Sequence, residues 1–412
     1  MKFPRRRIRA DPQPARRRSA GYLTLPRRTV LGATISNSLA VLPVFLLGGT
    51  AVLVRRDLGF SESQLGAAVS LFFLVSAAGS VPGGRIGERI GAYRAMAISA
   101  AGSGAALLGI AAAAASYLQL LAWLCLAAAA NALAQPATNL ALARGVSPSR
   151  QGLAFGIKQS AIPLATLVSG LAVPIIGLTV GWRWAFAGGA LGAVLFAVAA
   201  PKPERVRGAR RRARPALETG MRSLLVLAAA AGLGAAAANS MGAFYVESAV
   251  AHGISPGAAG LWFAAGSIAG VTGRVLTGWF ADRRAGGHFA VVALLLMAGA
   301  GGFALLASPG RPVVLAIATV LAFAAGWGWT GLFNFAVVRW NRAAPATATG
   351  ITQAGIFIGG VIGPLAFGAL AEHVSYAVAW WSGAVWLLAA AGLVRLGRLL
   401  LVADLRAKGL VP

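Results

Sequence analysis

Twelve long apolar runs constrain this 412-residue chain more than any other feature. Only 11% of its residues are charged, whereas soluble domains carry about 25%. A helix needs roughly 20 apolar residues to cross the hydrocarbon core of a bilayer. Runs such as residues 99–115 and 291–307 lack the polar–apolar alternation of a membrane β-barrel. The sequence therefore predicts an all-α membrane protein that crosses the bilayer many times.

The distribution of basic residues predicts the topology. We expect transmembrane helices at residues 29–54, 63–83, 92–115, 117–143, 152–177, 184–200, 222–250, 257–280, 288–307, 312–338, 346–371 and 375–395. An even number of spans places both chain ends on one side. Of the 37 Lys and Arg residues, all lie in or beside segments on that side except Arg55, Arg56, Arg183 and Arg311. By the positive-inside rule, both termini are expected to be cytoplasmic.

Basic segments also divide the chain into domains. Residues 1–28 are expected to form a basic cytoplasmic tail, 201–221 a basic cytoplasmic linker and 401–412 a second cytoplasmic tail. Residues 29–200 and 222–400 would then each form a six-helix bundle. The dense positive charge of the linker favours a solvated segment that lies on anionic lipid headgroups. Because the net charge of +27 follows the topology, we expect no nucleic-acid partner.

The two bundles repeat each other at an offset of 194 residues. Matching positions include Gly66 and Gly260, Glu88-Arg89 and Asp282-Arg283, and Gln159 and Gln353. Ser61 and Ser255 are the expected N-caps of the second and eighth spans. Since six spans are an even number, the two halves enter the membrane from the same side, which is a parallel repeat found in one large class of transporters. This arrangement favours alternating access between two rigid bundles over a pore.

A loop between the second and third spans carries a family signature. Residues 84–94 read GRIGERIGAYR, which resembles the G-x-x-x-[D/E]-R-x-G-x-x-[R/K] loop of the major facilitator superfamily. Residues 278–286 repeat it, with the glycine one residue late at Gly286. The resemblance covers residues 29–400. It implies the major facilitator fold, the inner membrane of a bacterium and a protein that works as a monomer.

The resemblance also implies a cytoplasmic latch formed by these two loops. Glycines there would let helices approach closely, and an acidic side chain would be favoured at the N-terminus of a helix in the other half. Arginines would complete a charge network that breaks when the transporter opens inward. The predicted latch residues are Gly84, Glu88, Arg89, Gly91, Arg94, Gly278, Asp282 and Arg283.

The fifth span refines the resemblance. With Gly156, Pro163 and Gly170, it looks like the glycine- and proline-rich fifth helix of the superfamily. It lacks the full glycine pattern that resembles antiporters. Together with the residues 181–184, GWRW, this makes the chain similar to cyanate-permease-like and anion-handling members.

Polar side chains inside the spans are the candidates for contact with a solute, since such groups are costly in a membrane. Asn131, Gln135 and Asn139 recur every four residues and so share one helical face. The resemblance implies that spans 1, 4, 7 and 10 line the cavity. The alternative is hydrogen bonding that only holds helices together. The candidate cavity residues are Asn37, Asn131, Gln135, Asn139, Gln159, Asn239, Tyr245, Trp327, Thr330, Asn334 and Gln353.

Two basic residues within the spans are candidate contacts for an anionic solute. Lys158 lies near the start of the fifth span, where it could instead extend to the cytoplasmic headgroups. Arg274 lies near the inner end of the eighth span, where it could instead belong to the latch of Asp282.

The acidic residues separate the functional alternatives. Only Glu247, near the outer end of the seventh span, lies inside a span. An exporter of cationic drugs would need a carboxylate deep in its cavity. We therefore predict secondary active transport of a small anionic or neutral organic solute, as a symporter with a coupling proton as a further partner. The alternatives are a proton-coupled multidrug efflux antiporter and, in another class, a non-transporting membrane sensor or scaffold.

No catalytic or metal site is expected, and the protein is not expected to be an enzyme. His252, His288 and His373 are far apart at span ends, and Cys125 is the single cysteine. No phosphate-cradling loop followed by Lys and Ser or Thr is present, so we expect no cofactor and no drive by ATP.

Overall fold

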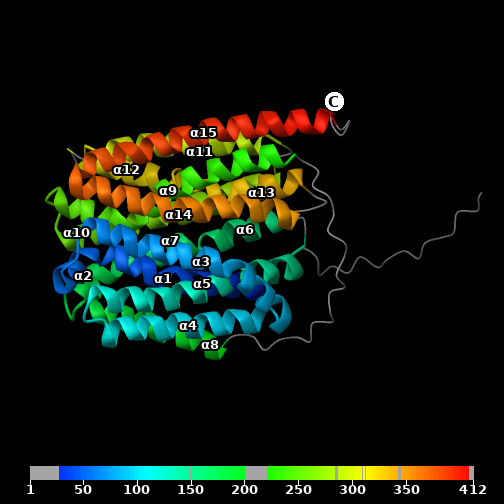
Figure 1. Ribbon diagram of the computed structural model, residues 1–412. Coiled ribbons are helices and arrows are strands. Elements are labelled where there is room, and N and C mark those ends of the chain that lie inside the picture. The colour runs from blue at the N-terminus through cyan, green and yellow to red at the C-terminus, as the bar shows by residue number, and fades with distance from the viewer. Residues whose placement is uncertain are drawn as a thin grey trace, which may run out of the picture.

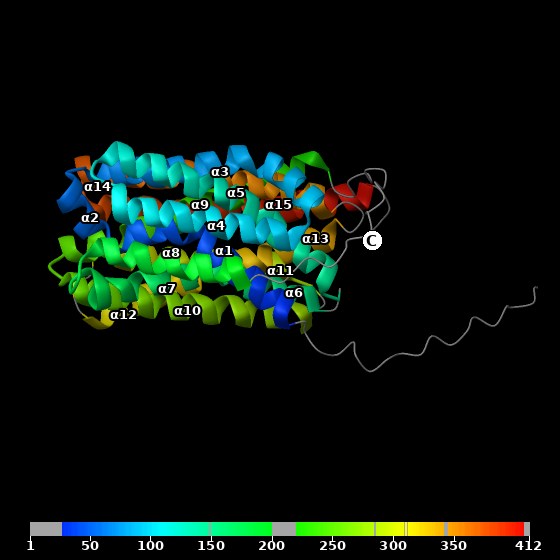
Figure 2. The ribbon, with the colours of Figure 1, turned by 90° about the horizontal axis from the view of Figure 1, so that it is seen from below.

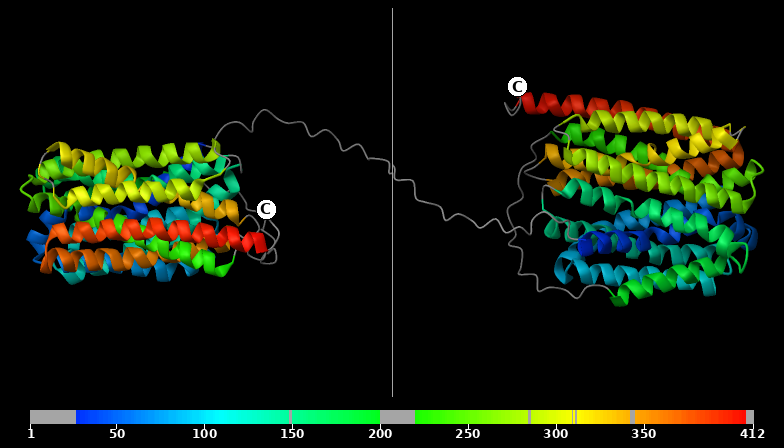
Figure 3. Two further views of the ribbon diagram at one scale, coloured as in Figure 1. Left: turned by 90° about the horizontal axis from the view of Figure 1, so that it is seen from above. Right: turned by 180° about the vertical axis from the view of Figure 1, so that it is seen from behind.

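The computed structural model describes residues 27–147, 150–199, 220–283, 286–308, 310, 312–341 and 345–407. Within these ranges, twelve helical segments are long and apolar enough to cross a membrane. They run roughly along one direction in a single elongated bundle (Figure 1, Figure 2). The predicted all-α fold with twelve spans is therefore confirmed. The described chain begins and ends at the same end of the bundle, which we call the terminal end (Figure 3).

The first half of the chain supplies six of these spans. Its elements are α1 (Arg27–Gly49), α2 (Ala51–Leu58), α3 (Glu62–Ile90), α4 (Ala92–Ala113), α5 (Tyr117–Gly145), α6 (Gln151–Gln159), α7 (Ala161–Ala172), the π-helical turn η3 (Val173–Gly177) and α8 (Trp182–Ala199). The elements α6, α7 and η3 together make one span. The short helix α2 marks the opposite end of the bundle, which we call the distal end (Figure 1).

The second half supplies the other six spans. Its elements are α9 (Met221–Ala251), α10 (Pro256–Arg283), α11 (His288–Leu306), α12 (Pro312–Ala324), α13 (Trp329–Trp340), α14 (Pro345–His373) and α15 (Tyr376–Ala407). The helices α12 and α13 are the two parts of one broken span.

The first span is shorter than predicted. It ends at Gly49, and after Thr50 the chain continues as α2. This helix carries Arg55, Arg56 and Asp57, which favour the polar boundary of a membrane over its hydrocarbon core. The prediction of one span over residues 29–54 is therefore corrected to a span and a separate distal helix.

The last span is longer than predicted. The helix continues beyond residue 395 to Ala407, because its final turns still have an apolar face on which Leu401 is buried. Asp404 also accepts a hydrogen bond from the backbone N–H of Gly220 at 3.0 Å. This contact joins the last helix to the start of α9.

Serine caps begin the second and eighth spans, as the repeat predicts. The Ser61 hydroxyl accepts a hydrogen bond from the backbone N–H of Gln64, whose side chain accepts one from the backbone of Ser61. Ser255 accepts a hydrogen bond from the backbone N–H of Ala258 at 3.4 Å. The two caps fix where equivalent spans start at the distal end.

Glycines bring the two halves into close contact. A Cβ atom at Gly48 in α1 would overlap the carbonyl oxygen of Gly242 in α9, and one at Gly170 in α7 would lie 2.6 Å from the carbonyl oxygen of Gly260 in α10. Such close approach between helices is typical of small residues in membrane proteins. A third contact runs between α3 and α14, where the hydroxyl of Ser70 donates to the carbonyl of Val361 at 2.5 Å.

Candidate functional site

A break in the fifth span leaves a backbone acceptor free. The helix α6 ends at Gln159, and α7 begins at Ala161. Pro163 stands four residues after Gln159 and has no N–H, so it cannot bond the Gln159 carbonyl as a regular helix would. The sequence itself therefore exposes this carbonyl to a partner outside the helix.

The partner is Arg274 of the other half. Nη1 of its guanidinium donates a hydrogen bond to the carbonyl of Gln159. Its Nε and Nη2 donate to the carbonyl of Trp327 at 3.1 and 2.9 Å. Trp327 lies in the break between α12 and α13, and its ring centroid is 5.7 Å from the guanidinium carbon. The fully buried Arg274 thus joins the broken spans of the two halves.

Lys158 is the second buried cation of this site. Its side chain is buried, with 2% of the residue exposed, and Nζ donates to Oε1 of Gln135 at 2.8 Å. The side chain therefore does not extend to the lipid headgroups in this structure, which was the alternative role considered for Lys158. Because Lys158 directly precedes Gln159, whose carbonyl Arg274 binds, the two buried basic residues lie at the same point of the fifth span. We call Lys158, Arg274, Gln135 and Gln159 the central cation site.

No carboxylate neutralises this site among the described side chains. The three ion pairs in the described part of the chain all lie at the distal end, and none includes Lys158 or Arg274. The C-terminal carbonyls of α6 lower the cost of burying these cations, because a helix C-terminus carries partial negative charge. Carbonyl dipoles do not supply a full negative charge, so both buried basic side chains lack an ionic partner among the described residues. A buried charge of this kind is costly without an ionic partner.

Several neutral candidates are buried without full hydrogen bonding. Both side-chain polar atoms of Asn37 and the hydroxyl of Thr330 have no partner among the described residues. Asn131 donates to the hydroxyl of Ser76 at 3.0 Å, while its Oδ1 is unpartnered. Buried polar groups are nearly always bonded in proteins. These orphaned atoms, on α1, α13 and α5, are therefore available to a ligand or to water.

The other predicted cavity residues differ in their surroundings. Asn239 is buried and donates to the carbonyl of Ala235 in its own helix. Tyr245 packs within the second half, where its hydroxyl bonds to Thr319 and its ring stacks on Phe263, so the structure does not bring it to the central cation site. The remaining candidates are half-buried or exposed: Gln353 and Asn334 are half-buried, and Asn139 is exposed.

The predicted latch forms no ion pair among the described residues. Glu88, Arg89 and Arg94 are exposed at the terminal end, and no ion pair between described residues includes them. The Arg283 guanidinium lies 3.7 Å from the ring centroid of Trp279. The side chain of Asp282 lies outside the described residues. The latch therefore stays a prediction about another state of the protein.

Glycines in the two latch loops serve different purposes. Gly91 has a φ of 91° where α3 turns into α4, a conformation that favours glycine. In the second loop the equivalent turn falls at Gly287, with a φ of 77°, one residue beyond the predicted Gly286. A Cβ at Gly84 would meet only Pro136, at 3.6 Å, whereas Gly156 packs directly on the backbone of Gly278. The close approach of α6 to α10 thus requires glycine at Gly156, and Gly84 takes no part in such a contact.

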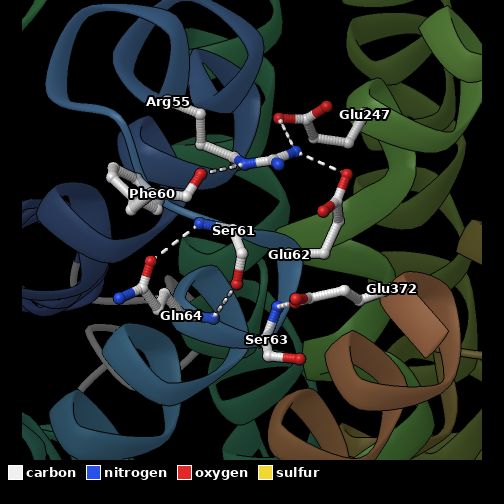
Figure 4. Close-up of polar contacts among 8 residues, drawn as sticks. All are labelled: Arg55, Phe60, Ser61, Glu62, Ser63, Gln64, Glu247 and Glu372. Atoms are coloured by element: carbon white, nitrogen blue, oxygen red, sulfur yellow. Dashed lines mark hydrogen bonds and ion pairs between the residues drawn. The ribbon is translucent and has the colours of Figure 1, made fainter.

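The distal end holds an ion-pair cluster that crosses between the halves (Figure 4). Nη1 of Arg55 on α2 lies 2.8 Å from Oε1 of Glu62 on α3 and 3.1 Å from Oε1 of Glu247 on α9. A second link joins the backbone N–H of Ser63 to the carboxylate of Glu372 on α14 at 2.7 Å. We call these five residues the distal cluster.

An exposed ion pair stands beside this cluster within the first half. Arg183 lies 2.6 Å from the carboxylate of Asp57. The Arg183 guanidinium beside Asp57 holds the pKa of that carboxyl below its usual value. The site prediction omitted Arg55, Glu62 and Glu372. The rarity of basic residues on this side and of acids inside spans was the signal that could have identified Arg55 and Glu247.

A family model described as the Major Facilitator Superfamily matches residues 33–344. The chain therefore belongs to the Major Facilitator Superfamily, as the signature loop indicated. A comparison with curated protein sequences finds no match. The resemblance to cyanate-permease-like members stays a prediction.

Three solved structures that resemble this chain are transporters. A bacterial homolog of the human lysosomal transporter Spinster, in an inward-facing and occupied conformation, aligns with a TM-score of 0.69 at 16% identity, covering 93% of this chain and 98% of that one. A D-xylose–proton symporter aligns with a TM-score of 0.71 at 17% identity, covering 89% and 97%. The proton:xylose symporter XylE bound to 6-bromo-6-deoxy-D-glucose aligns with a TM-score of 0.67 at 17% identity, covering 89% and 94%.

Proposed function

We propose that this protein is a secondary transporter of a small organic anion. The single observation that carries the proposal is the central cation site. Lys158 and Arg274 are buried between the two halves and have no carboxylate partner among the described residues. An anionic solute that enters between the halves would neutralise both cations, and charge-assisted hydrogen bonds are the strong ones in proteins.

The unpartnered polar groups support a solute with further polar atoms. Asn37, Asn131 and Thr330 offer amide and hydroxyl groups from α1, α5 and α13. These groups can donate to or accept from a hydroxyl or a second carboxyl group. Small hydroxylated or dicarboxylic acids fit this combination of cations and neutral hydrogen-bonding groups.

Charge also favours the anion over the alternatives. A neutral solute would leave both buried basic side chains without an ionic partner. A cationic drug would add a third charge of the same sign, and the acid nearest the interior of a span, Glu247, is already paired with Arg55 at the distal end. The sensor or scaffold alternative gives no reason for buried cations at the boundary between two repeated bundles.

The proposed transport cycle uses the two halves as rigid units. Arg274 and the distal cluster both cross between the halves, so rocking of the bundles would break and remake them in turn. The distribution of basic residues supports placing the terminal end in the cytoplasm of a bacterium and the distal end outside its inner membrane. The fold of the D-xylose–proton symporter supports a coupling proton and symport.

Uptake by cells or proteoliposomes tests the proposal. Labelled monocarboxylates, dicarboxylates and cyanate would be compared with labelled D-xylose and with efflux of a cationic dye. We expect uptake of at least one anion. Dye export or xylose uptake without any anion uptake would refute the proposal.

The variant Lys158→Gln tests the site itself. It keeps a hydrogen-bonding side chain but removes the charge, and a hydrogen bond to a charged group is worth about 1.5–3 kcal/mol. We therefore expect kcat/KM for the anion to fall roughly 10- to 100-fold. The control Arg183→Gln removes a positive charge of the first half at the exposed distal surface and should leave the anion's kcat/KM within about twofold.

A further inference from the structure

The distal cluster borders a cavity of about 290 Å³ between the two halves. Charged and polar residues supply much of its lining: Arg55, Arg56, Glu62, Glu247 and Tyr376, with Phe60 beside them. Since α2, α3, α9 and α15 contribute to it, the cavity lies where the two halves meet at the distal end. A space of this size accommodates a small organic molecule.

Arg55 is partly occupied in this cavity. Its Nη1 is shared by the carboxylates of Glu62 and Glu247, and its Nε donates to the carbonyl of Phe60 at 3.0 Å. No acceptor among the described residues bonds its Nη2. An arginine can bind a carboxylate through two parallel N–H groups, but Glu247 uses one. The pair of Arg55 and Glu247 is therefore weaker than the two-bond pair that a free carboxylate can form with an arginine.

Two further groups in the cavity are available to a ligand. Arg56 is exposed, lines the cavity and takes part in no ion pair between described residues. The hydroxyl of Tyr376 is buried without a hydrogen-bond partner in the described part of the chain. Two guanidinium groups and a free phenolic hydroxyl suit a carboxylate that has an additional polar atom.

We propose that this cavity is an external docking site for the carboxylate of the transported anion, in which Glu247 is an intramolecular competitor for Arg55. The inference rests on the proposed function, because it takes the solute to be a carboxylate. The incoming carboxylate replaces that of Glu247 on Arg55 and gains Arg56 and Tyr376 as further partners. The side chain of Glu247 stands in for the solute while the cavity is empty.

The exchange has a consequence for the distal end. Arg55 and Glu62 both belong to the first half, and their pair persists when Glu247 is displaced. The charged link to α9 in the second half is then lost. Docking of the solute thus removes one of the contacts that link the two halves at the distal end, so the solute itself favours separation of the halves there.

The variant Glu247→Gln tests the competition. Uptake of an anion that the wild type transports would be measured in right-side-out vesicles as a function of its external concentration. Without the competing charge, the external KM should fall roughly three- to tenfold. In Glu247→Asp the shorter side chain reaches Arg55 less well, so the external KM should decrease by a smaller factor. This second variant keeps the test possible if Glu247→Gln does not fold.

A matched control separates competition from simple loosening of the distal end. Glu372→Gln weakens the other link between the halves, to the backbone of Ser63, without releasing an arginine. We expect it not to lower the external KM. In the double variant Arg55→Gln/Glu247→Gln, the decrease caused by Glu247→Gln should disappear.

Each result decides between the two proposals. If Glu247→Gln and Glu372→Gln lower the KM equally, or if Glu247→Gln leaves it unchanged, the docking site is wrong while anion transport stands. If the wild type takes up no organic anion, the proposed function fails, and the docking site fails with it.

Discussion

Arg274 in the second half of the chain donates to the backbone carbonyl of Gln159 in the first half. That carbonyl is free because Pro163, four residues later, has no N–H. A sequence feature of one half thus prepares the acceptor for a buried cation of the other. The contact places the guanidinium next to Lys158, and so creates the concentration of positive charge on which anion transport is proposed to depend.

The variant Pro163→Ala tests whether the free carbonyl of Gln159 matters for transport. It returns an N–H that competes with Arg274 for the Gln159 carbonyl. Loss of part of a charge-assisted hydrogen bond costs about 1 kcal/mol, so kcat/KM for the anion should fall about fivefold. The control Pro43→Ala makes the same change within α1 of the same half. Equal rates for the two variants would contradict the role of the free carbonyl.

Packing at the distal end gives a second prediction. A side chain at Gly48 would overlap the carbonyl oxygen of Gly242, and overpacking of this kind costs about 1–3 kcal/mol. Gly48→Val should therefore keep the distal end from closing and reduce uptake to below about a tenth of the wild-type rate. Gly32→Val, in the same helix but with open space around its Cβ, is the control. Normal uptake by Gly48→Val would show that this contact is not needed for the cycle.

The latch gives a third prediction. Since Glu88 is exposed and has no ion pair with a described residue, the latch would form only in a state that is closed at the terminal end. Glu88→Gln or Asp282→Asn should favour the inward-open state by about 0.5–1 kcal/mol. A cysteine at the exposed Asn139, in a Cys125→Ser background, should then react about threefold faster with a thiol reagent. An unchanged rate, or an equal increase in the loop control Arg85→Gln, would argue against the latch.

The exposed pair of Asp57 and Arg183 predicts a small dependence of stability on pH. Because Arg183 lowers the pKa of Asp57 in the folded protein, the pair contributes stability above the unfolded pKa of about 3.9, and this is lost as pH falls through the folded value. The side chains are 42% and 45% exposed, so the contribution is below about 1 kcal/mol. Asp57→Asn should lower Tm slightly at pH 7, and this difference should shrink as pH falls below the unfolded pKa. A Tm difference that grows on acidification would contradict the assignment.

Sequence reasoning identified the fold because its signals are local and repeated. Apolar run length, the Ser61 cap and the signature loop at residues 84–94 each depend on neighbouring residues. The boundaries at residues 54 and 395 were wrong, because apolar content alone does not show that Thr50 interrupts a helix or that Leu401 has a buried face.

The site was only partly predictable, because it depends on contacts between residues that are far apart in the sequence. Lys158 and Arg274 stood out as charges inside spans, but their meeting depends on contact between halves that are more than a hundred residues apart. The partnership of Arg55 with Glu247 likewise depends on how α2 folds back over α9. Contacts between residues so far apart in the sequence follow from the packing of the two bundles, which no local sequence pattern encodes.

The central claim is that buried positive charge selects the solute. Its most direct test is inhibition of labelled carboxylate uptake, in proteoliposomes, by the unlabelled carboxylate and by its uncharged carboxamide. We predict that the carboxylate inhibits the wild type at least about tenfold better than the amide, and that Lys158→Gln loses most of this difference. Equal inhibition of the wild type by acid and amide, or full discrimination by Lys158→Gln, would contradict the account.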